Sequence, residues 1–169
     1  VPPGEEWVLE LNFNQIEYIP PFDSHPSLVY HNMCELLMAG NNLSFLTDEL
    51  LQFPNLRKIN LGGNRLTVVP ALGRLPLQSV ELAANRIESI PPSIFDFTSV
   101  TCLDLSENCL CDLPHLPNTL VTLNLRINQF EALPPHISTL TSLTTLDISE
   151  NAITHLPPNF ERLTALCRL

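Results

Sequence analysis

Leucine, isoleucine and asparagine recur along this chain in one order, L-x-x-L-x-L-x-x-N-x-L. The order is nearly complete in residues 56–66 and again in residues 143–153. Successive copies place their asparagines 27, 23, 21, 23, 20 and 23 residues apart. A repeat of this length predicts a solenoid, in which each copy forms one coil of the chain. The seven asparagines that share this place are Asn14, Asn41, Asn64, Asn85, Asn108, Asn128 and Asn151.

The closely spaced leucine pair in each copy predicts a short strand. Side chains alternate between the two faces of a strand, so we expect Leu103 and Leu105 to point inward and Asp104 to point outward. The asparagine comes where the chain turns out of the strand. Its amide can bond the backbone groups that a buried bend leaves unpaired. Stacked coils would place these amides in register as a continuous internal ladder.

The segment after each asparagine predicts the outer side of the coil. An inward pair such as Ile87 and Ile90 is usually followed by proline, which is tolerated at the start of a helix but not inside one. The returning chain then carries apolar residues three apart, a spacing that suits a short 3₁₀ or helical turn. These later pairs are Ile94 and Phe97, Ile137 and Leu140, and Phe160 and Leu163.

This pattern resembles the leucine-rich repeat family over nearly the full chain. The 23-residue form is similar to the typical intracellular subclass, found in Ras-pathway scaffolds and in arms of phosphatases, kinases and Roco-type GTPases. Residues 113–120 instead resemble the L-P-x-L-P-x-x-L unit of bacterial effectors. The resemblance implies an α/β solenoid: a right-handed arc with a parallel concave β-sheet and short 3₁₀, helical or extended convex segments.

The repeats predict a single domain over residues 1–169, with about seven coils. A hydrophobic content of 44% and a charged content of 15% suit stacked repeats that share one core. Residues 166–169 reproduce the first positions of an eighth repeat, so we expect a fragment of a longer leucine-rich repeat protein. The exposed end near Leu166 and Leu169 would then favour dimerisation. Residues 20–33 contain an insertion whose role stays open.

Five scattered cysteines favour an intracellular, cytoplasmic location. Extracellular repeat proteins of this kind usually carry clustered cysteines in disulfide caps, and none is visible in this sequence. Cys109 and Cys111 with His115 do not predict a metal site, because zinc needs four ligands and Leu110 between the thiols is an inward position. No catalytic motif or cofactor-binding loop occurs, so we expect neither enzymatic activity nor a cofactor in this segment.

Function is expected on the concave strand face, where outward residues are free of packing duties. A formal net charge of −10 disfavours nucleic acid, and the absence of a long apolar run disfavours membrane insertion. Acidic columns favour a protein partner with a basic surface. Side-chain-poor positions such as Gly40 and Gly63, and exposed Phe13 and Ile127, would assist docking. The candidate binding residues are Glu81, Asp104, Glu107, Asp147, Glu150, Lys58, Arg65, Arg86, Leu37 and Arg126.

The leading hypothesis is a protein–protein interaction module in intracellular signalling or scaffolding. The alternative is a targeting or regulatory arm of a larger enzyme, such as a protein phosphatase, kinase, GTPase or cyclase, or of a bacterial leucine-rich repeat effector. A receptor ectodomain is disfavoured because no cysteine caps are visible. The sequence beyond residue 169 would discriminate between the first two classes.

Overall fold

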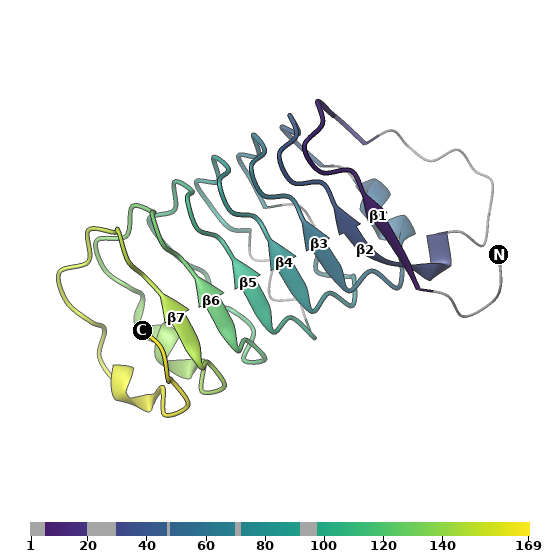
Figure 1. Ribbon diagram of the computed structural model, residues 1–169. Coiled ribbons are helices and arrows are strands. Elements are labelled where there is room, and N and C mark those ends of the chain that lie inside the picture. The colour runs from purple at the N-terminus through teal and green to yellow at the C-terminus, as the bar shows by residue number, and fades with distance from the viewer. Residues whose placement is uncertain (1–5, 20–29, 47, 70–71, 92–97) are drawn as a thin grey trace.

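The computed structural model describes residues 6–19, 30–46, 48–69, 72–91 and 98–169. Within these residues seven strands form one parallel sheet, in which sequence order is also spatial order (Figure 1). Each strand begins a coil that returns to pair with the next, so the termini lie at opposite ends of the stack. The strands are β1 (Trp7–Glu10), β2 (Met33–Leu37), β3 (Lys58–Asn60), β4 (Ser79–Glu81), β5 (Cys102–Asp104), β6 (Thr122–Asn124) and β7 (Thr145–Asp147).

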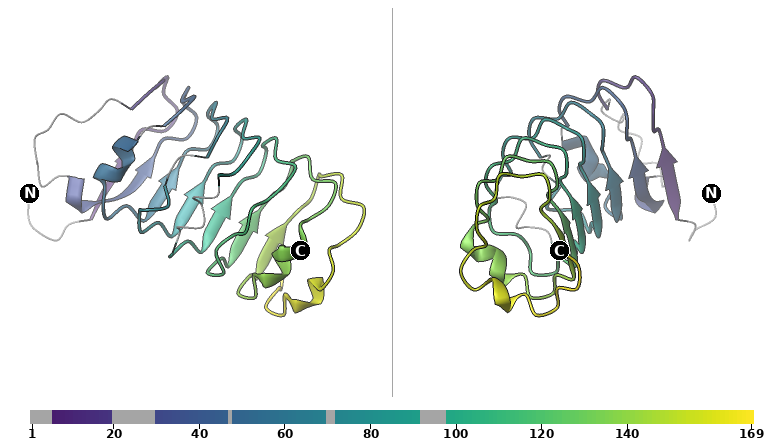
Figure 2. Two further views of the ribbon diagram at one scale, coloured as in Figure 1. Left: turned by 180° about the vertical axis from the view of Figure 1, so that it is seen from behind. Right: turned by 60° about the vertical axis from the view of Figure 1, so that its left-hand side comes forward.

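Short 3₁₀ helices lie in the connections between strands, most of them on the side of the stack opposite the sheet (Figure 2). They are η1 (Tyr30–Asn32), η2 (Asp48–Gln52), η4 (Pro135–Thr139) and η5 (Phe160–Arg162). Pro134 immediately precedes η4, and Ile137 and Leu140 are almost fully buried beneath it. The expected 3₁₀ turns therefore occur at two of the three predicted places. Ile94 and Phe97 lie outside the described residues.

The core is a continuous column of inward leucines and isoleucines. In β4 and β5 the inward Val80 and Leu103 are fully buried, whereas Glu81 and Asp104 are half-buried on the other face. Because each strand is only a few residues long, no coil can bury its own apolar face, and burial comes from its neighbours. The predicted solenoid with a parallel sheet and few helices is confirmed.

The asparagine amides join successive coils. Asn85 Nδ2 donates to Leu82 O in its own coil at 3.0 Å and to Leu61 O in the preceding coil at 2.9 Å. Asn85 Oδ1 accepts the Leu66 N–H at 3.0 Å. The same three bonds recur at Asn41, Asn64, Asn108, Asn128 and Asn151.

Asn14 in the first coil has a reduced set of bonds. Its Nδ2 donates to Leu11 O at 3.0 Å and to Asn12 O at 3.1 Å, both in its own coil. No coil precedes it among the described residues, so it receives no N–H from a neighbour. Asn14 is also exposed, whereas Asn85 is only 8% exposed.

The residue before each ladder asparagine adopts the left-handed conformation. These residues are Phe13, Gly40, Gly63, Ala84, Glu107, Ile127 and Glu150, with φ between 53° and 66°. Glycine accepts this conformation without strain, and a β-branched residue such as Ile127 does not. A Cβ at Gly40 would also lie 2.6 Å from Cδ1 of Phe13. Backbone geometry therefore explains Gly40 and Gly63 without a docking role.

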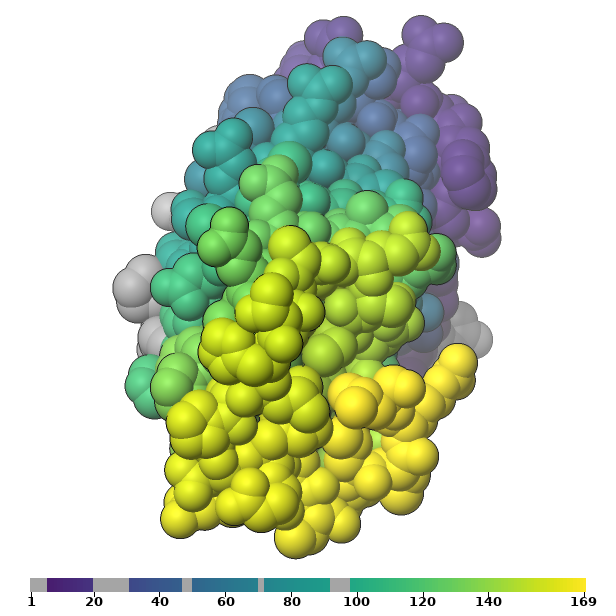
Figure 3. Space-filling model, turned by 90° about the vertical axis from the view of Figure 1, so that its left-hand side faces the viewer, coloured from purple at the N-terminus to yellow at the C-terminus, as the bar shows by residue number. Residues whose placement is uncertain are grey.

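The last coil, which faces the viewer in Figure 3, is less covered than the central coils. Its inward positions Ile148, Ile153 and Phe160 are only half-buried, although their counterparts in central coils are buried. Pairing of β7 continues at its outer side through Leu146, whose N–H donates to Arg168 O at 3.0 Å. Dimerisation through this end stays a prediction.

The first connection is only partly described. Residues 20–29, which include Pro20 and His25, lie outside the described residues, as does Pro70. Residues 30–32 form η1 and lead directly into β2. The role of the 20–33 insertion is therefore not assigned.

The ladder predicts unequal effects for the same substitution at two positions. Asn85→Ala leaves the Leu66 N–H unsatisfied in the core and should lower the free energy of unfolding by roughly 2–4 kcal/mol. Asn14→Ala, which removes only exposed local bonds, should cost less than about 1 kcal/mol. Equilibrium denaturation of both variants measures the difference. Equal losses would contradict the ladder.

Candidate functional site

The concave face contains one more column of outward residues than the sequence analysis considered. Strand pairing aligns the residue that precedes each inward leucine as well as the residue that follows it. This first column is largely small and polar in the later strands, and strict alternation along each strand would have revealed it. Its members are Val8, Glu35, Lys58, Ser79, Cys102, Thr122 and Thr145.

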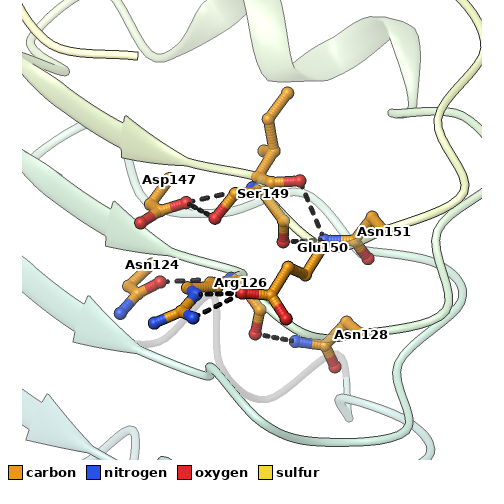
Figure 4. Close-up of polar contacts among 8 residues, drawn as sticks. Asn124, Arg126, Asn128, Asp147, Ser149, Glu150 and Asn151 are labelled. Carbon is orange, nitrogen blue, oxygen red and sulfur yellow. Dashed lines mark hydrogen bonds and ion pairs between the residues drawn. The ribbon is translucent and has the colours of Figure 1, made fainter.

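Two aspartates on the concave face are held by the same hydrogen bonds. Asp147 Oδ1 accepts the Ser149 N–H at 3.0 Å and the Ser149 O–H at 2.6 Å (Figure 4). Asp104 Oδ1 accepts the corresponding bonds from Ser106 at 2.9 and 2.6 Å. These outward side chains therefore have a structural role in hydrogen bonding, although they do not pack in the core. Each closes a local turn after its strand.

Asparagine makes the same bond in β3 and β6. Asn60 Oδ1 accepts the Gly62 N–H at 2.9 Å, and Asn124 Oδ1 accepts the Arg126 N–H at 3.1 Å. The turn thus accepts this bond from a neutral amide as readily as from a carboxylate, and β2 forms its turn with Leu37 at the same position. The choice between a carboxylate and an amide at this strand position can therefore serve a purpose other than closing the turn.

The surroundings of Asp147 stabilise the ionised form of its carboxyl group. Hydrogen bonds from the Ser149 side chain and backbone, with a smaller contribution from Arg126, hold the pKa of Asp147 below its usual value. A depressed pKa means that the ionised form stabilises the folded state at neutral pH. That contribution is lost as the pH falls through the lowered pKa.

The remaining candidate acids differ in how far they are neutralised. Glu81 pairs with Lys58 Nζ at 3.3 Å and also accepts the Asn60 amide. Glu150 pairs with Arg126 of the neighbouring coil (Figure 4). Within the described part of the chain the Glu107 side chain makes no hydrogen bond or ion pair. Exposed ion pairs of this kind contribute little stability, so these groups stay available to a partner.

The candidate cations Lys58, Arg65 and Arg86 do not lie on one face of the stack. Arg57 pairs with Glu6 at 2.7 Å at the start of β3. Arg65 and Arg86 lie beyond the asparagine turn, on the flank of the stack, where their N–H groups bond Leu43 O and Leu66 O. Of the candidate cations, only Lys58 and Arg126 project from the concave surface.

The apolar candidates also differ in exposure. Phe13 is 85% exposed and covers Gly40. Leu37 lies on the concave face but is half-buried, as are Trp7 and Ile127. The exposed aromatic anchor of this surface is therefore Phe13, at its N-terminal end.

The described residues contain no group of three or more histidine, cysteine, aspartate or glutamate side chains arranged to hold a metal ion. His115 instead stacks against His136, with ring centroids 4.1 Å apart. Burial raises the pKa of the Cys34 and Cys102 thiols, which makes them less reactive. In the same part of the chain no helix has the length and apolar character needed to cross a membrane.

The sheet and its asparagine ladder define a parallel β-solenoid of short repeats. Residues 118–169 and residues 55–75 match family models described as leucine-rich repeat. The chain is a leucine-rich repeat protein. Proteins of this class generally bind other proteins, using the extended concave surface that the stacked strands create.

Known proteins with the same repeats are considerably longer. Keratocan of Gallus gallus is 31% identical over 125 residues, which cover 72% of this chain and 35% of keratocan. Human oligodendrocyte-myelin glycoprotein is 30% identical over 101 residues, covering 59% of this chain and 23% of that protein. The chain thus spans about a third or less of the length of these relatives.

Solved structures share the fold. A leucine-rich repeat protein of Leptospira interrogans superimposes with a TM-score of 0.87 and 35% identity, covering 95% of this chain and 41% of that one. An internalin of Listeria monocytogenes gives a TM-score of 0.74 over 96% of this chain and 46% of that one. At 24% identity the internalin supports the architecture alone. None of the relatives named here has a name that describes an enzyme.

Substitution of Ser149 tests the environment of Asp147. Ser149→Ala removes the O–H donor but keeps the N–H donor, so the pKa of Asp147 should rise towards its ordinary value. NMR titration of the Asp147 carboxyl measures the shift. Thr141→Ala, which changes an exposed hydroxyl outside this face, is the control. An unchanged Asp147 pKa in Ser149→Ala would contradict the assigned cause.

Proposed function

We propose that this segment binds another protein through the concave face of its sheet, in intracellular signalling or scaffolding, and that the bound surface is basic. The observation that carries the proposal is the repeated carboxylate of Asp104 and Asp147, held by identical bonds two coils apart. Segments 104–108 and 147–151 differ only in Leu105 and Ile148. At the usual strand spacing the two carboxylates are about 10 Å apart.

The hydrogen bonds on these carboxylates favour binding because they fix the side chains in advance. A side chain that is already ordered loses less conformational entropy when a partner arrives. Asp147 uses Oδ1 for Ser149, and its Oδ2 makes no hydrogen bond within the described residues. This second oxygen supports contact with an incoming lysine or arginine.

The acidic groups should act mainly on recognition and association rate. A formal net charge of −10 attracts basic surfaces and repels nucleic acid and anionic membranes. Seven strands make a surface roughly 30 Å long, which is enough for a folded partner or an extended peptide. Phe13 at one end supplies an apolar contact beside the charged region.

An intracellular location is part of the proposal. All five cysteines are free thiols in the structure, and an odd number cannot pair completely within one chain. A disulfide in the native purified protein would contradict this location. A role as the regulatory arm of a larger enzyme stays a prediction, to be decided by the complete reading frame.

Paired neutralisations test the concave surface. Glu107→Gln with Asp147→Asn removes two charges from this face. The fold should persist, because Glu107 makes no side-chain bond in the described structure and asparagine already serves at the Asp147 position in other strands. We expect the variant to lose proteins that the wild type captures from a reduced cytosolic extract, as measured by quantitative mass spectrometry. Affinity for each such protein should fall about tenfold and depend less on salt.

The matched control changes the same net charge elsewhere. Glu88→Gln with Glu131→Gln neutralises two exposed flank carboxylates that make no side-chain bond within the described residues. This control should retain every protein that the wild type captures. If the wild type, the concave-face variant and this control capture the same proteins with the same affinity, the concave surface is not the binding site.

A further inference from the structure

Three exposed apolar side chains lie side by side on the flank of the stack that follows the asparagine turn. Tyr18, Phe45 and Val68 are 61%, 54% and 53% exposed and occupy the same position in three successive coils. We name this set the flank stripe. In the later coils the position carries Ser89, Asp112, Ala132 and His155. Adjacent exposed apolar groups of this size mark interaction surfaces rather than ordinary solvent-facing positions.

The flank stripe rests on a rigid backbone. The Asn42 N–H bonds Ile16 O at 2.9 Å, and the Arg65 N–H bonds Leu43 O at 2.8 Å. Successive coils are therefore hydrogen-bonded on the flank as well as in the sheet. The stripe consequently advances by about one strand spacing per coil, with Phe45 at its centre.

Opposite charges lie at the two ends of the flank stripe. Glu17 immediately precedes Tyr18 in the first coil, and Arg65 lies three residues before Val68 in the third. Neither charged side chain makes a hydrogen bond or ion pair within the described residues. Lys58 and Arg126, by contrast, are each paired with a carboxylate. The stripe is thus apolar at its centre and acidic at one end, and its other end is net basic, because Arg65 and Arg86 outnumber Glu88 of the fourth coil there.

This arrangement is complementary to itself. In a two-fold symmetric interface a residue i contacts j, and j contacts i. When two stripes meet in antiparallel orientation with Phe45 on the axis, Tyr18 of each copy lies against Val68 of the other. Glu17 of each copy then lies within reach of Arg65 of the other.

We propose that the flank stripe is the contact of a reversible homodimer, in which two copies of this chain pack antiparallel. A different acidic or basic protein would match only one end of the stripe, whereas a second copy satisfies both ends. The contact is small, so the dimer should be weak and in exchange with the monomer. It leaves the concave face of both copies open, and it is separate from the C-terminal end.

Sedimentation equilibrium of the whole chain over a range of concentrations tests the proposal. Wild-type protein should dimerise with increasing concentration, and Phe45→Ser should remain monomeric with an unchanged circular dichroism spectrum. Glu17→Arg alone and Arg65→Glu alone should each weaken association by about tenfold. The double variant, which exchanges the two charges, should recover it to within about threefold of the wild type.

Two controls locate the contact. Glu131→Arg changes charge on the same flank outside the stripe and should leave association unchanged. Leu169→Ser should also leave it unchanged. A protein that stays monomeric at all concentrations overturns the proposal. So does a dimer that survives Phe45→Ser, or one that is lost in Leu169→Ser. Failure of the charge exchange to restore association excludes the antiparallel second copy.

Discussion

The fold depends on hydrogen bonding at the bend that follows each strand. Every coil turns there inside the protein, where unpaired backbone groups are costly. Leu61 O illustrates the solution, because it accepts Nδ2 of Asn64 from its own coil and Nδ2 of Asn85 from the next, each at 2.9 Å. Every ladder amide except that of Asn14 also accepts an N–H from the preceding coil. The amides therefore satisfy the bends and hold neighbouring coils in register at once.

This register determines what the concave surface can display. In β3, β5, β6 and β7 the outward residue between the two inward positions meets the need of the N–H two residues later for an oxygen acceptor, a bond that Leu37 of β2 cannot make. Aspartate and asparagine both meet that requirement, and only aspartate adds a charge. Asp104 and Asp147 therefore supply the oxygen acceptor that their turns use, and they add a charge that the turns do not need. We attribute that charge to function. Their bonds to serine hold that charge in a fixed place.

Much of the fold could be predicted from the repeat, and rather less of the site. Alternation placed Leu103 and Leu105 in the core and Asp104 on the surface, because a two-residue period follows from strand geometry. The alternation does not reveal hydrogen bonds between an outward side chain and the turn that follows it, such as that between Asp147 and Ser149. Proximity in sequence also misled: Lys58 and Arg65 are only seven residues apart, but the asparagine turn puts them on different sides of the coil.

Native-state hydrogen exchange tests the central role of the ladder most directly. The N–H groups of Leu66 and Ile87 are bonded to the side-chain oxygens of Asn85 and Asn108 in the next coils. These amides should exchange only through global unfolding, and Asn85→Ala should accelerate exchange at Leu66 far more than at Ile87. If Leu66 in the wild type exchanges at the rate of an exposed backbone amide, the asparagines do not hold the coils together.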